Sequence, residues 1–398
     1  MEYRYSNKTL GMRPSIIREL LKQMSDPQLI SFAGGNPAAD SFPIRDIRAF
    51  SDQLLASDPV GMLQYSVTEG YGPLRTACRA FANRQWPVVK DSDEVIITSG
   101  SQQVIEFTAK LLCNEGDVVA VEEPAFLGAY NSMRGFGAVL RGVPLQPDGV
   151  DLAALEAVFA AEPKPKFFYC IPNFQNPTGY TTSLAKRKAI YRLAVKYGVP
   201  VLEDDPYGAL RISGEDVPPI KHFDEEGAVI YAGSFSKILC PGMRLAFCAG
   251  QPDLITKMVT AKQGSDVHTN VWAQRVCERM LTQTDMSAHI ARLQAIYREK
   301  ANHMMDRLDE ELAGAVTYVR PEGGMFIWAK LPDEVPAGEF VRRCLEKKLA
   351  VVPGSAFYTD STVEQPFLRL NFSTPTTEQI DRGVAIMAEV LAEMTNPQ

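Results

Sequence analysis

The chain has 398 residues and a net charge of −7, and 45% of its residues are hydrophobic and 22% charged. This composition is typical of a soluble globular protein of two or three domains, and it argues against disorder, coiled coil or collagen-like repeats as global descriptions. The mildly acidic balance, without a run of Lys and Arg, argues against binding to nucleic acid or to anionic membranes.

The cysteines and histidines give no indication of disulfide bonds or of a bound metal ion. Seven cysteines are scattered along the chain and form no CxxC motif, which predicts reduced thiols in a cytoplasmic protein. The four histidines form neither HxxxH nor HExxH, so we expect no dedicated zinc site. The N-terminus lacks the apolar core of a signal peptide, and the longest uncharged stretch, 167–185, holds polar residues and prolines that do not suit a membrane span.

In chain order, the first predicted element is a short helix over 15–24. From about residue 45, helices alternate with short apolar strands bounded by turn residues. The predicted strands are 95–100, 118–124, 166–173, 200–206, 228–234 and 244–250. Continuous apolar strands separated by helices indicate a mostly parallel sheet covered on both faces, so we expect a large α/β domain over residues 45–285.

The C-terminal part has a different pattern. A long helix is predicted over 285–312, followed by strand-like segments and a final helix over about 378–394. These elements indicate a smaller α+β domain of residues 286–398. We expect the N-terminal residues 1–44 to pack with it and to supply a lid over the substrate.

The residues that follow the strands are the candidates for a site, because ligands of open α/β sheets bind beyond the carboxyl ends of the strands. Ser101 and Gln102 follow the strand 95–100 at a helix start, where free backbone N–H groups favour an anion. The sequence Asn-Pro-Thr-Gly after 166–173 is either a plain turn or a place where the Asn176 amide donates to a ligand oxygen. Neither a Walker loop nor GxGxxG occurs, which disfavours a nicotinamide dehydrogenase.

Three acidic residues end the strand 200–206. Glu203, Asp204 and Asp205 would repel one another unless one of them has a cationic partner. That partner is either a metal ion or a ligand nitrogen that must stay protonated. No second cluster of carboxylates or histidines accompanies these acids in the sequence.

Lys237 follows the apolar strand 228–234 among hydroxyl groups. It is either a solvated lysine, or a lysine whose pKa is lowered by burial and nearby cations and which can act as nucleophile and base. Ser234, Ser236 and Arg244 beside it supply a phosphate site. Together with an acid for a ring nitrogen, these groups demand a phosphorylated cofactor with an aldehyde, which is pyridoxal 5′-phosphate.

In these motifs the chain resembles the fold-type I pyridoxal-phosphate aminotransferases of class I/II, in the branch of 2-aminoadipate, kynurenine/2-aminoadipate and aromatic aminotransferases. The resemblance runs from about Ser15 to the C-terminus. It rests on SIIREL, SFAGGNP, YSVTEGYGPLR, TSGSQQ, FQNPTGY, EDDPYG, GSFSKILCPGMR and FLRLNFS, in family order. It implies a homodimer that moves an amino group from an amino acid to 2-oxoglutarate in a ping-pong cycle.

The resemblance also implies a role for each residue of the cofactor site. Lys237 would form the Schiff base and move the substrate's proton, and Asp204 would pair with the pyridine nitrogen. Asn176 and Tyr207 would hydrogen-bond the ring oxygen, and Phe126 would stack on the ring where many relatives carry a tyrosine. The phosphate would be surrounded by Ser101, Gln102, Ser234, Ser236, Arg244 and, from the neighbouring subunit, Tyr65.

For the substrate, the resemblance implies that Arg369 clamps the α-carboxylate, with Asn176 beside it, and that Arg18 on a mobile N-terminal helix meets a distal carboxylate. Gly34 and Gly35 would leave room for the substrate beside the backbone. Arg18 could equally be a solvated helix residue, and the two glycines a simple turn. The donor stays open among 2-aminoadipate, kynurenine, an aromatic amino acid and a branched aliphatic one.

Two alternatives use the same scaffold. A β-eliminating lyase shares the cofactor frame and would release ammonia and pyruvate. A non-catalytic sensor domain of a transcription factor would need an N-terminal winged-helix domain, for which a resemblance that starts near residue 15 leaves no room. We therefore expect an enzyme, and among enzymes a transaminase.

Overall fold

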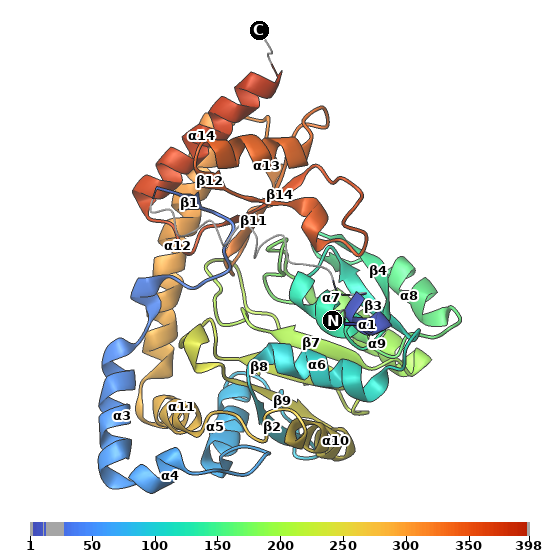
Figure 1. The fold of residues 1–398 in the computed structure, drawn as a ribbon, viewed down its shortest axis with the longest axis vertical. Coiled ribbons are helices and arrows are strands. Elements are labelled where there is room, and N and C mark those ends of the chain that lie inside the picture. The colour runs from blue at the N-terminus through green and yellow to red at the C-terminus, as the bar shows by residue number, and fades with distance from the viewer. Residues whose placement is uncertain (1–2, 11, 13–27, 396–398) are drawn as a thin grey trace.

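The computed structural model describes residues 3–10, 12 and 28–395, so Arg18 and the helix predicted over 15–24 lie outside the described residues. An eight-stranded sheet with its helices forms the lower part of the molecule in Figure 1, and a four-stranded sheet lies in the upper part. The long helix α12, Met286–Glu311, runs beside both parts. It confirms the helix predicted over 285–312.

The large sheet has the strand order β2-β9-β8-β7-β6-β3-β4-β5. Its strands are β2 Glu94–Thr98, β3 Val118–Glu123, β4 Val139–Gln146, β5 Gly149–Val150, β6 Phe168–Cys170, β7 Val201–Asp205, β8 Val229–Ser234 and β9 Ala246–Gly250. The pairs from β8 through β4 are parallel, whereas β9 runs antiparallel to both β2 and β8. The predicted mostly parallel sheet is confirmed.

The strands β4 and β5 are absent from the predicted set. β4 reads VLRGVPLQ, and only one of its residues, Val143, is buried. It lies near the edge of the sheet, where a proline is tolerated and a continuous apolar run is not needed. The pattern that marks a strand buried on both faces is therefore missing from its sequence.

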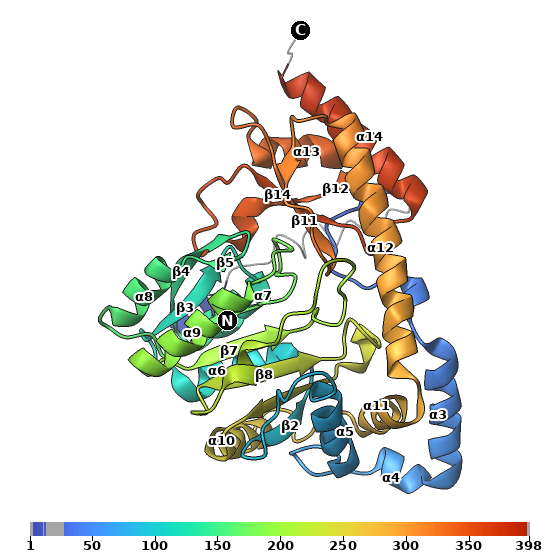
Figure 2. The same cartoon turned by 180° about the vertical axis from the view of Figure 1, so that it is seen from behind.

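Side chains that alternate along β6 show that both faces of the large sheet are covered. Tyr169 packs in a core cluster with Val104 and Ile105 of α6, whereas Phe168 and Cys170 pack in another cluster with residues of α8 and α9. Helix α6 accordingly lies in front of the sheet in Figure 1 and behind it in Figure 2. The helices around this sheet are α3 Ile44–Ser57, α4 Pro59–Leu63, α5 Gly72–Ala82, α6 Ser101–Leu112, α7 Leu127–Arg134, α8 Leu152–Ala160, α9 Leu184–Tyr197, α10 Pro252–Gln263 and α11 Val271–Gln283.

The smaller sheet has the order β10-β11-β14-β13, and the pair β1-β12 accompanies it. These strands are β10 Thr317–Tyr318, β11 Phe326–Lys330, β13 Val352–Pro353, β14 Phe367–Asn371, β1 Ile30–Ser31 and β12 Leu349–Ala350. Helices α13, Ala337–Glu346, and α14, Thr377–Thr395, pack together beside them. The parallel pairing of β1 with β12 ties the N-terminal segment to the C-terminal part of the chain. The domain limits at 44/45 and 285/286 stay a prediction.

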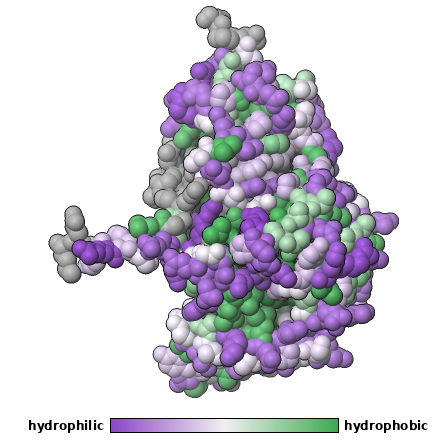
Figure 3. Space-filling model, turned by 90° about the vertical axis from the view of Figure 1, so that its right-hand side faces the viewer, coloured by the Kyte–Doolittle hydropathy of each residue, from purple (hydrophilic) through white to green (hydrophobic). Residues whose placement is uncertain are grey.

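The remaining described helices are short. They are α1 Asn7–Leu10 and the 3-10 helices η2 Ala39–Ser41, η3 Ile220–Phe223, η4 Pro241–Met243 and η5 Gly354–Phe357. None of the helices in the described part of the chain combines the length and the apolar character that crossing a bilayer requires. On the side of the molecule seen in Figure 3, hydrophobic residues gather in patches toward its middle and lower part, among hydrophilic ones.

Candidate active site

A cavity of about 250 Å³ lies at the carboxyl ends of β6, β7 and β8, beside the turn between β2 and α6. This is the edge where ligands of parallel sheets bind. The structure brings most of the predicted site residues together there. Those that line the cavity are Gly35, Ser101, Gln102, Phe126, Asn176, Asp204, Tyr207, Ser234, Ser236, Lys237, Arg244 and Arg369.

Of the three acids at the end of β7, only Asp204 lines the cavity. The carboxylate of Glu203 accepts from the backbone N–H groups of residues 220 and 221. Asp205 accepts from Asn173 at 3.0 Å and from the phenol of Tyr231 at 2.9 Å. The other two carboxylates are thus engaged elsewhere, which leaves Asp204 to meet a ligand.

Asp204 is buried, and only one of its two carboxylate oxygens accepts a hydrogen bond from the described residues. Its Oδ2 accepts from the phenol of Tyr169 at 3.0 Å, whereas its Oδ1 has no hydrogen-bond partner among the described residues. Burial raises the pKa of Asp204 to about 7, and the hydrogen bond from Tyr169 only partly offsets this rise. A buried carboxylate oxygen without a partner is costly, so the site is complete only when a donor, preferably a cationic one, reaches Oδ1.

Lys237 lies just after β8, and its Nζ donates to the backbone oxygen of Gly35 at 2.7 Å. Burial, with the guanidinium groups of Arg369 and Arg244 nearby, lowers the pKa of Lys237 to about 8. The neutral fraction of this amine at physiological pH is therefore far larger than that of a solvated lysine, although the ammonium form still predominates. The solvated alternative for Lys237 does not hold, and the amine is suited to act as a nucleophile and a base.

The turn between β2 and α6 forms a cradle for an anion. Gly100 adopts a φ of +85°, and a Cβ atom on it would lie 2.5 Å from Nη2 of Arg244. Ser101 begins α6, so the free N–H groups of its first turn and the Arg244 guanidinium converge beside the hydroxyls of Ser234 and Ser236. A phosphate suits this combination of backbone donors, hydroxyls and a guanidinium.

Gln102 contributes to this cradle less directly than its place in the sequence suggests. Its side-chain Nε2 donates to the backbone oxygen of Gly128 at 2.8 Å and to Ser132. The amide therefore holds α7 against α6. What Gln102 offers to an anion is its backbone N–H in the first turn of the helix.

Arg369 on β14 is a buried guanidinium on the opposite side of the cavity from the sheet. It donates to Oδ1 of Asn176 at 3.0 Å and to the backbone oxygen of Ala33 at 2.6 Å, and its Nε has no partner among the described residues. The rings of Phe326 and Phe357 flank it at 4.4 and 4.9 Å. Burial lowers its pKa to about 10. Because no carboxylate of the described chain pairs with it, a ligand carboxylate is the partner this fork fits.

Two predicted residues lie elsewhere. Tyr65 is 81% exposed, does not line the cavity and meets the ring of His268 edge-on, with 5.7 Å between the ring centroids. Its predicted reach into a neighbouring subunit stays a prediction. Arg18 lies outside the described residues. The segment with Gly34 and Gly35 does reach the site, where its backbone oxygens accept from Arg369 and Lys237.

A few residues of the site were not predicted. Tyr169 holds Asp204 from the neighbouring strand, and Phe326 and Phe357 sandwich Arg369. A tyrosine inside the apolar run FFYC carried the only usable signal, because a buried phenol needs a hydrogen-bond partner. The two phenylalanines read as ordinary core residues in the sequence.

A second cavity of about 280 Å³ lies behind the strand ends, beside Arg84, Asp205 and Tyr231. Its lining contains no lysine. The carboxylate of Asp205 is already satisfied by Asn173 and Tyr231, and that of Asp216, also in the lining, accepts from Gln85 and Arg211. This cavity therefore lacks both the nucleophile and the free acid that the first one has.

Comparisons with known proteins agree with this geometry. The model of the aminotransferase class I and II family matches residues 27–387. The chain belongs to this family. Aromatic-amino-acid aminotransferase 1 of Thermococcus litoralis is 36% identical over 98% of this chain and 94% of its own length. The 2-aminoadipate transaminase of Thermus thermophilus is 40% identical over 96% of this chain and 94% of its own.

The solved structures include a kynurenine aminotransferase from Pyrococcus horikoshii in complex with PMP, at a TM-score of 0.94 and 37% identity over 98% of both chains. The protein is thus an aminotransferase of fold type I, its cofactor is pyridoxal 5′-phosphate, and its substrates are amino acids and 2-oxo acids. The fold, the enzyme class and the cofactor predicted from the sequence are confirmed. The roles of the individual residues stay predictions.

Proposed function

We propose that this aminotransferase uses Lys237 as its catalytic residue and transfers the amino group of an aromatic amino acid, kynurenine or 2-aminoadipate to 2-oxoglutarate. The products would be the 2-oxo acid of the donor and glutamate. One observation carries the proposal. A half-buried amine of lowered pKa faces the same cavity as a buried carboxylate and a buried guanidinium, beside the anion cradle. Oδ1 of that carboxylate and Nε of that guanidinium have no partner in the described part of the chain.

The residues present fit pyridoxal 5′-phosphate at both ends of the molecule. Oδ1 of Asp204 has no donor within the residues that the structure describes, and the protonated ring nitrogen would supply one. The turn at Gly100 brings the backbone close to the guanidinium of Arg244, and a Cβ there would push that guanidinium away from the cradle. Phe126 in the cavity wall would stack on the ring, without the hydroxyl that a tyrosine would add.

When bound, the cofactor supplies an electron sink that stabilises negative charge at the α-carbon of the substrate. Asp204 keeps that sink effective because its carboxylate favours the protonated form of the ring nitrogen. Asn176 and Tyr207 would donate to the ring oxygen. Lys237, once free of the cofactor, would take the proton from the α-carbon as a general base and return it as a general acid to the carbon on the far side of the amino nitrogen, which is a 1,3-shift.

Arg369 would hold the substrate α-carboxylate and so fix the α-carbon within reach of Lys237. A planar fork binds a carboxylate in one orientation, which positions the bond to be broken. Phe326 and Phe357 would exclude water from this ion pair and so strengthen it.

The names of relatives support the proposed class of donor, since they include aromatic-amino-acid, 2-aminoadipate and kynurenine aminotransferases. A contact of Arg18 with a distal carboxylate remains part of this proposal.

We further propose that the enzyme is a homodimer in which Tyr65 reaches the phosphate of the neighbouring subunit. Support comes from the segment 60–67, which exposes apolar side chains that a second subunit would cover. They are Val60, Leu63, Tyr65 and Val67.

We place the enzyme in the cytoplasm, because its seven cysteines all lie among the described residues and all are free thiols. We expect neither nucleic acid nor a membrane as a partner.

The deciding experiment is the absorbance spectrum of the purified protein with single amino acids added. A visible cofactor band that disappears with a donor and returns with 2-oxoglutarate would establish the proposed transfer, and the amino acids that work would rank the donors. Accumulation of ammonia and pyruvate while the band persists would instead identify a β-eliminating lyase. Absence of any band after addition of pyridoxal phosphate would contradict the proposed cofactor site.

A further inference from the structure

A fully buried lysine lies behind the anion cradle, outside the cavity. Lys262, in α10, donates through Nζ to Oε1 of Gln103 at 2.7 Å and to both carboxylate oxygens of Asp266 at 2.8 and 2.9 Å. Oδ2 of Asp266 also accepts from the hydroxyl of Ser99 at 2.7 Å and from Nε2 of Gln103 at 3.0 Å. Neither the mechanism nor the cavity lining uses any of these residues.

One side of this network fixes the cradle turn. Ser99 immediately precedes Gly100 in the chain, and Gln103 immediately follows Gln102. Oε1 of Gln103 also accepts from the backbone N–H of Ser99 at 2.9 Å, so the turn is closed on itself as well as held to Lys262. The orientation of the N–H groups that face the phosphate therefore depends on Lys262 and Asp266.

The other side of the network fixes the loop that supports Tyr65. Asp266 lies in the loop after α10, where the backbone oxygen of Lys262 accepts from Asp266 and from Val267, each at 3.1 Å. Val267 adopts a φ of +64°, and the following His268 presents its ring to Tyr65. One ion pair thus holds both the cradle and the platform on which the exposed Tyr65 rests.

We propose that Lys262 and Asp266 are positioning residues. Within one subunit they align the phosphate cradle with the surface around Tyr65, which that subunit presents to its partner. This inference rests on the proposed function, because it requires both the phosphate in the cradle and the dimer. Removal of Asp266 leaves the buried ammonium of Lys262 without its counter-charge, and removal of Lys262 takes away the donor that joins Asp266 to Gln103, so in either variant the turn and the loop rearrange together. Loss of alignment reduces the grip on the phosphate and leaves the contacts to the ring unchanged.

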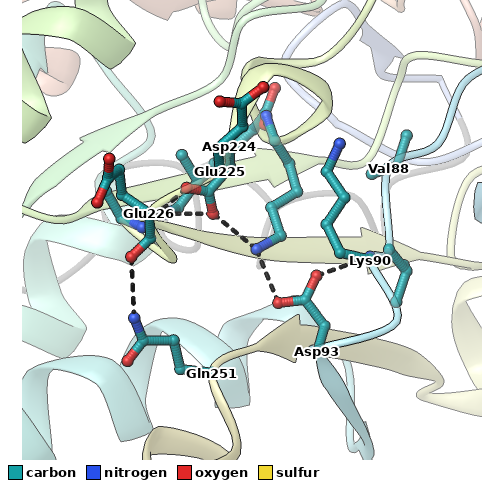
Figure 4. A network of polar contacts seen from close by, with 12 residues as sticks. Val88, Lys90, Asp93, Asp224, Glu225, Glu226 and Gln251 are labelled. Carbon is teal, nitrogen blue, oxygen red and sulfur yellow. Dashed lines mark hydrogen bonds and ion pairs between the residues drawn. The ribbon is translucent and has the colours of Figure 1, made fainter.

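The chain contains a matched control for this ion pair. Nζ of Lys221, also buried, donates to Asp93 at 2.9 Å and to Asp224 at 2.8 Å. Figure 4 shows Asp93 and Asp224 turned toward one amine, with Lys90 and Gln251 close by. These acids precede β2 and β8, at the end of the sheet away from the cavity. Damage to this network should destabilise the fold without reaching the cofactor.

The test compares the affinity of the cofactor-free full chain for pyridoxal phosphate with its affinity for pyridoxal, which lacks the phosphate. In Lys262→Met and Asp266→Asn we expect the affinity for pyridoxal phosphate to fall about tenfold or more and that for pyridoxal to stay unchanged. Lys221→Met leaves two buried carboxylates without their ammonium, so it should lower Tm at least as much and leave the preference for the phosphate intact. An unchanged preference in both test variants would overturn the positioning role.

A double variant guards against poor folding. Lys262→Met with Asp266→Leu removes both charges, leaves no unpaired one, and should fold. Its preference for the phosphate should still be reduced, because the hydrogen bonds to Ser99 and Gln103 are gone, and a wild-type preference would refute the inference. If the wild-type chain itself binds pyridoxal as tightly as pyridoxal phosphate, the proposed cofactor site fails instead.

The link to Tyr65 has its own readout. Tyr65→Phe should weaken binding of pyridoxal phosphate in the wild-type background and have little further effect in the Lys262→Met background, because the phenol is already misplaced there. An equal loss in both backgrounds would show that Tyr65 is positioned independently of Lys262. That result would limit the network to the cradle and overturn the proposed alignment.

Discussion

The phenol of Tyr169 donates a hydrogen bond of 3.0 Å to Oδ2 of Asp204 from the neighbouring strand of the sheet, and no residue that the structure describes partners Oδ1 of the same carboxylate. The tyrosine thus fixes the carboxylate while keeping one oxygen for a ligand. Because Asp204 is buried, this arrangement costs stability whenever the carboxylate is charged and alone. This loss of stability should therefore grow as Asp204 loses its proton, and should shrink when the cofactor supplies a donor to Oδ1.

Asp204→Asn should therefore stabilise the cofactor-free protein and weaken cofactor binding. Burial raises the pKa of Asp204 from 3.8 to about 7, so between these values the folded state keeps a proton that the unfolded state has lost. The free energy of unfolding then falls as pH rises from about 4 to 7, by up to about 4 kcal/mol from this residue. Urea unfolding at pH 5 and pH 8 should show a larger gain for the variant at pH 8. An equal gain at both pH values would contradict the assignment.

Uptake of the cofactor should depend on the protonation of Lys237. Burial and the cations of Arg369 and Arg244 lower its pKa to about 8, and only the neutral amine attacks an aldehyde. The rate at which the cofactor-free protein binds pyridoxal phosphate, followed by absorbance, should rise with pH and level off above about 8. Lys237→Ala should leave no cofactor that borohydride can attach to the chain, and its turnover should fall at least about 10⁴-fold. A rate that does not change between pH 6 and 9 would place the pKa elsewhere.

Arg369→Lys should raise the KM for amino acids by about 10- to 100-fold and change kcat less, because an ammonium keeps the charge and loses the fork. Steady-state kinetics with one donor at several concentrations measures both constants. Arg211→Lys is the control, since Arg211 also lies over an aromatic ring, that of Phe174, but borders the second cavity. Equal effects of the two substitutions on KM would argue against a carboxylate at Arg369.

Gly100→Ala should weaken the affinity for the cofactor by about tenfold, because its Cβ would displace Arg244 from the cradle. Gly116→Ala is a matched control. Gly116 has a φ of +89° and nothing within 4 Å of the added methyl group, so this variant carries only the backbone strain, about 1 kcal/mol. Both variants should unfold at lower denaturant concentration, and only Gly100→Ala should release the cofactor more readily on dialysis.

Mixed dimers test whether Tyr65 serves the neighbouring subunit. A dimer of one Tyr65→Ala and one Lys237→Ala subunit contains one site with Lys237 and with a Tyr65 from its partner. Refolding the two variants together should recover about a quarter of wild-type activity, more than the mean of the two parents. If Tyr65 served its own subunit, no site would be complete and the mixture would show only that mean.

The large sheet and the residues at its carboxyl edge could be predicted from the sequence. Its strands are buried on both faces and therefore appear as continuous apolar runs, and reactive side chains follow directly after them. Apolar runs that stop at Asp204 and just before Lys237 place both residues at the same edge of a parallel sheet. Contacts between segments far apart in the chain could not be read in this way. Arg369 meets Ala33 across more than three hundred residues, and no local pattern encodes that pairing.

The role of Gln102 is a further example. Its position at a helix start indicated a phosphate ligand, but the amide of its side chain is taken up by α7. Whether a side chain or its backbone N–H faces the ligand depends on packing between helices. A pattern of residue types along the chain does not contain that information.

The backbone oxygens of Ala33 and Gly35 accept from the guanidinium and the amine that the proposed reaction needs, those of Arg369 and Lys237. A substrate must compete with this segment for the guanidinium. A carboxylate wins that competition, because a charged acceptor binds an arginine more strongly than a neutral carbonyl does. An amino-acid amide would exchange one neutral acceptor for another and gain little, and a simple amine offers the guanidinium no acceptor at all. If Arg369 holds the substrate as proposed, this segment would favour amino acids over amines of the same side chain, because only a carboxylate displaces the backbone oxygen from the guanidinium.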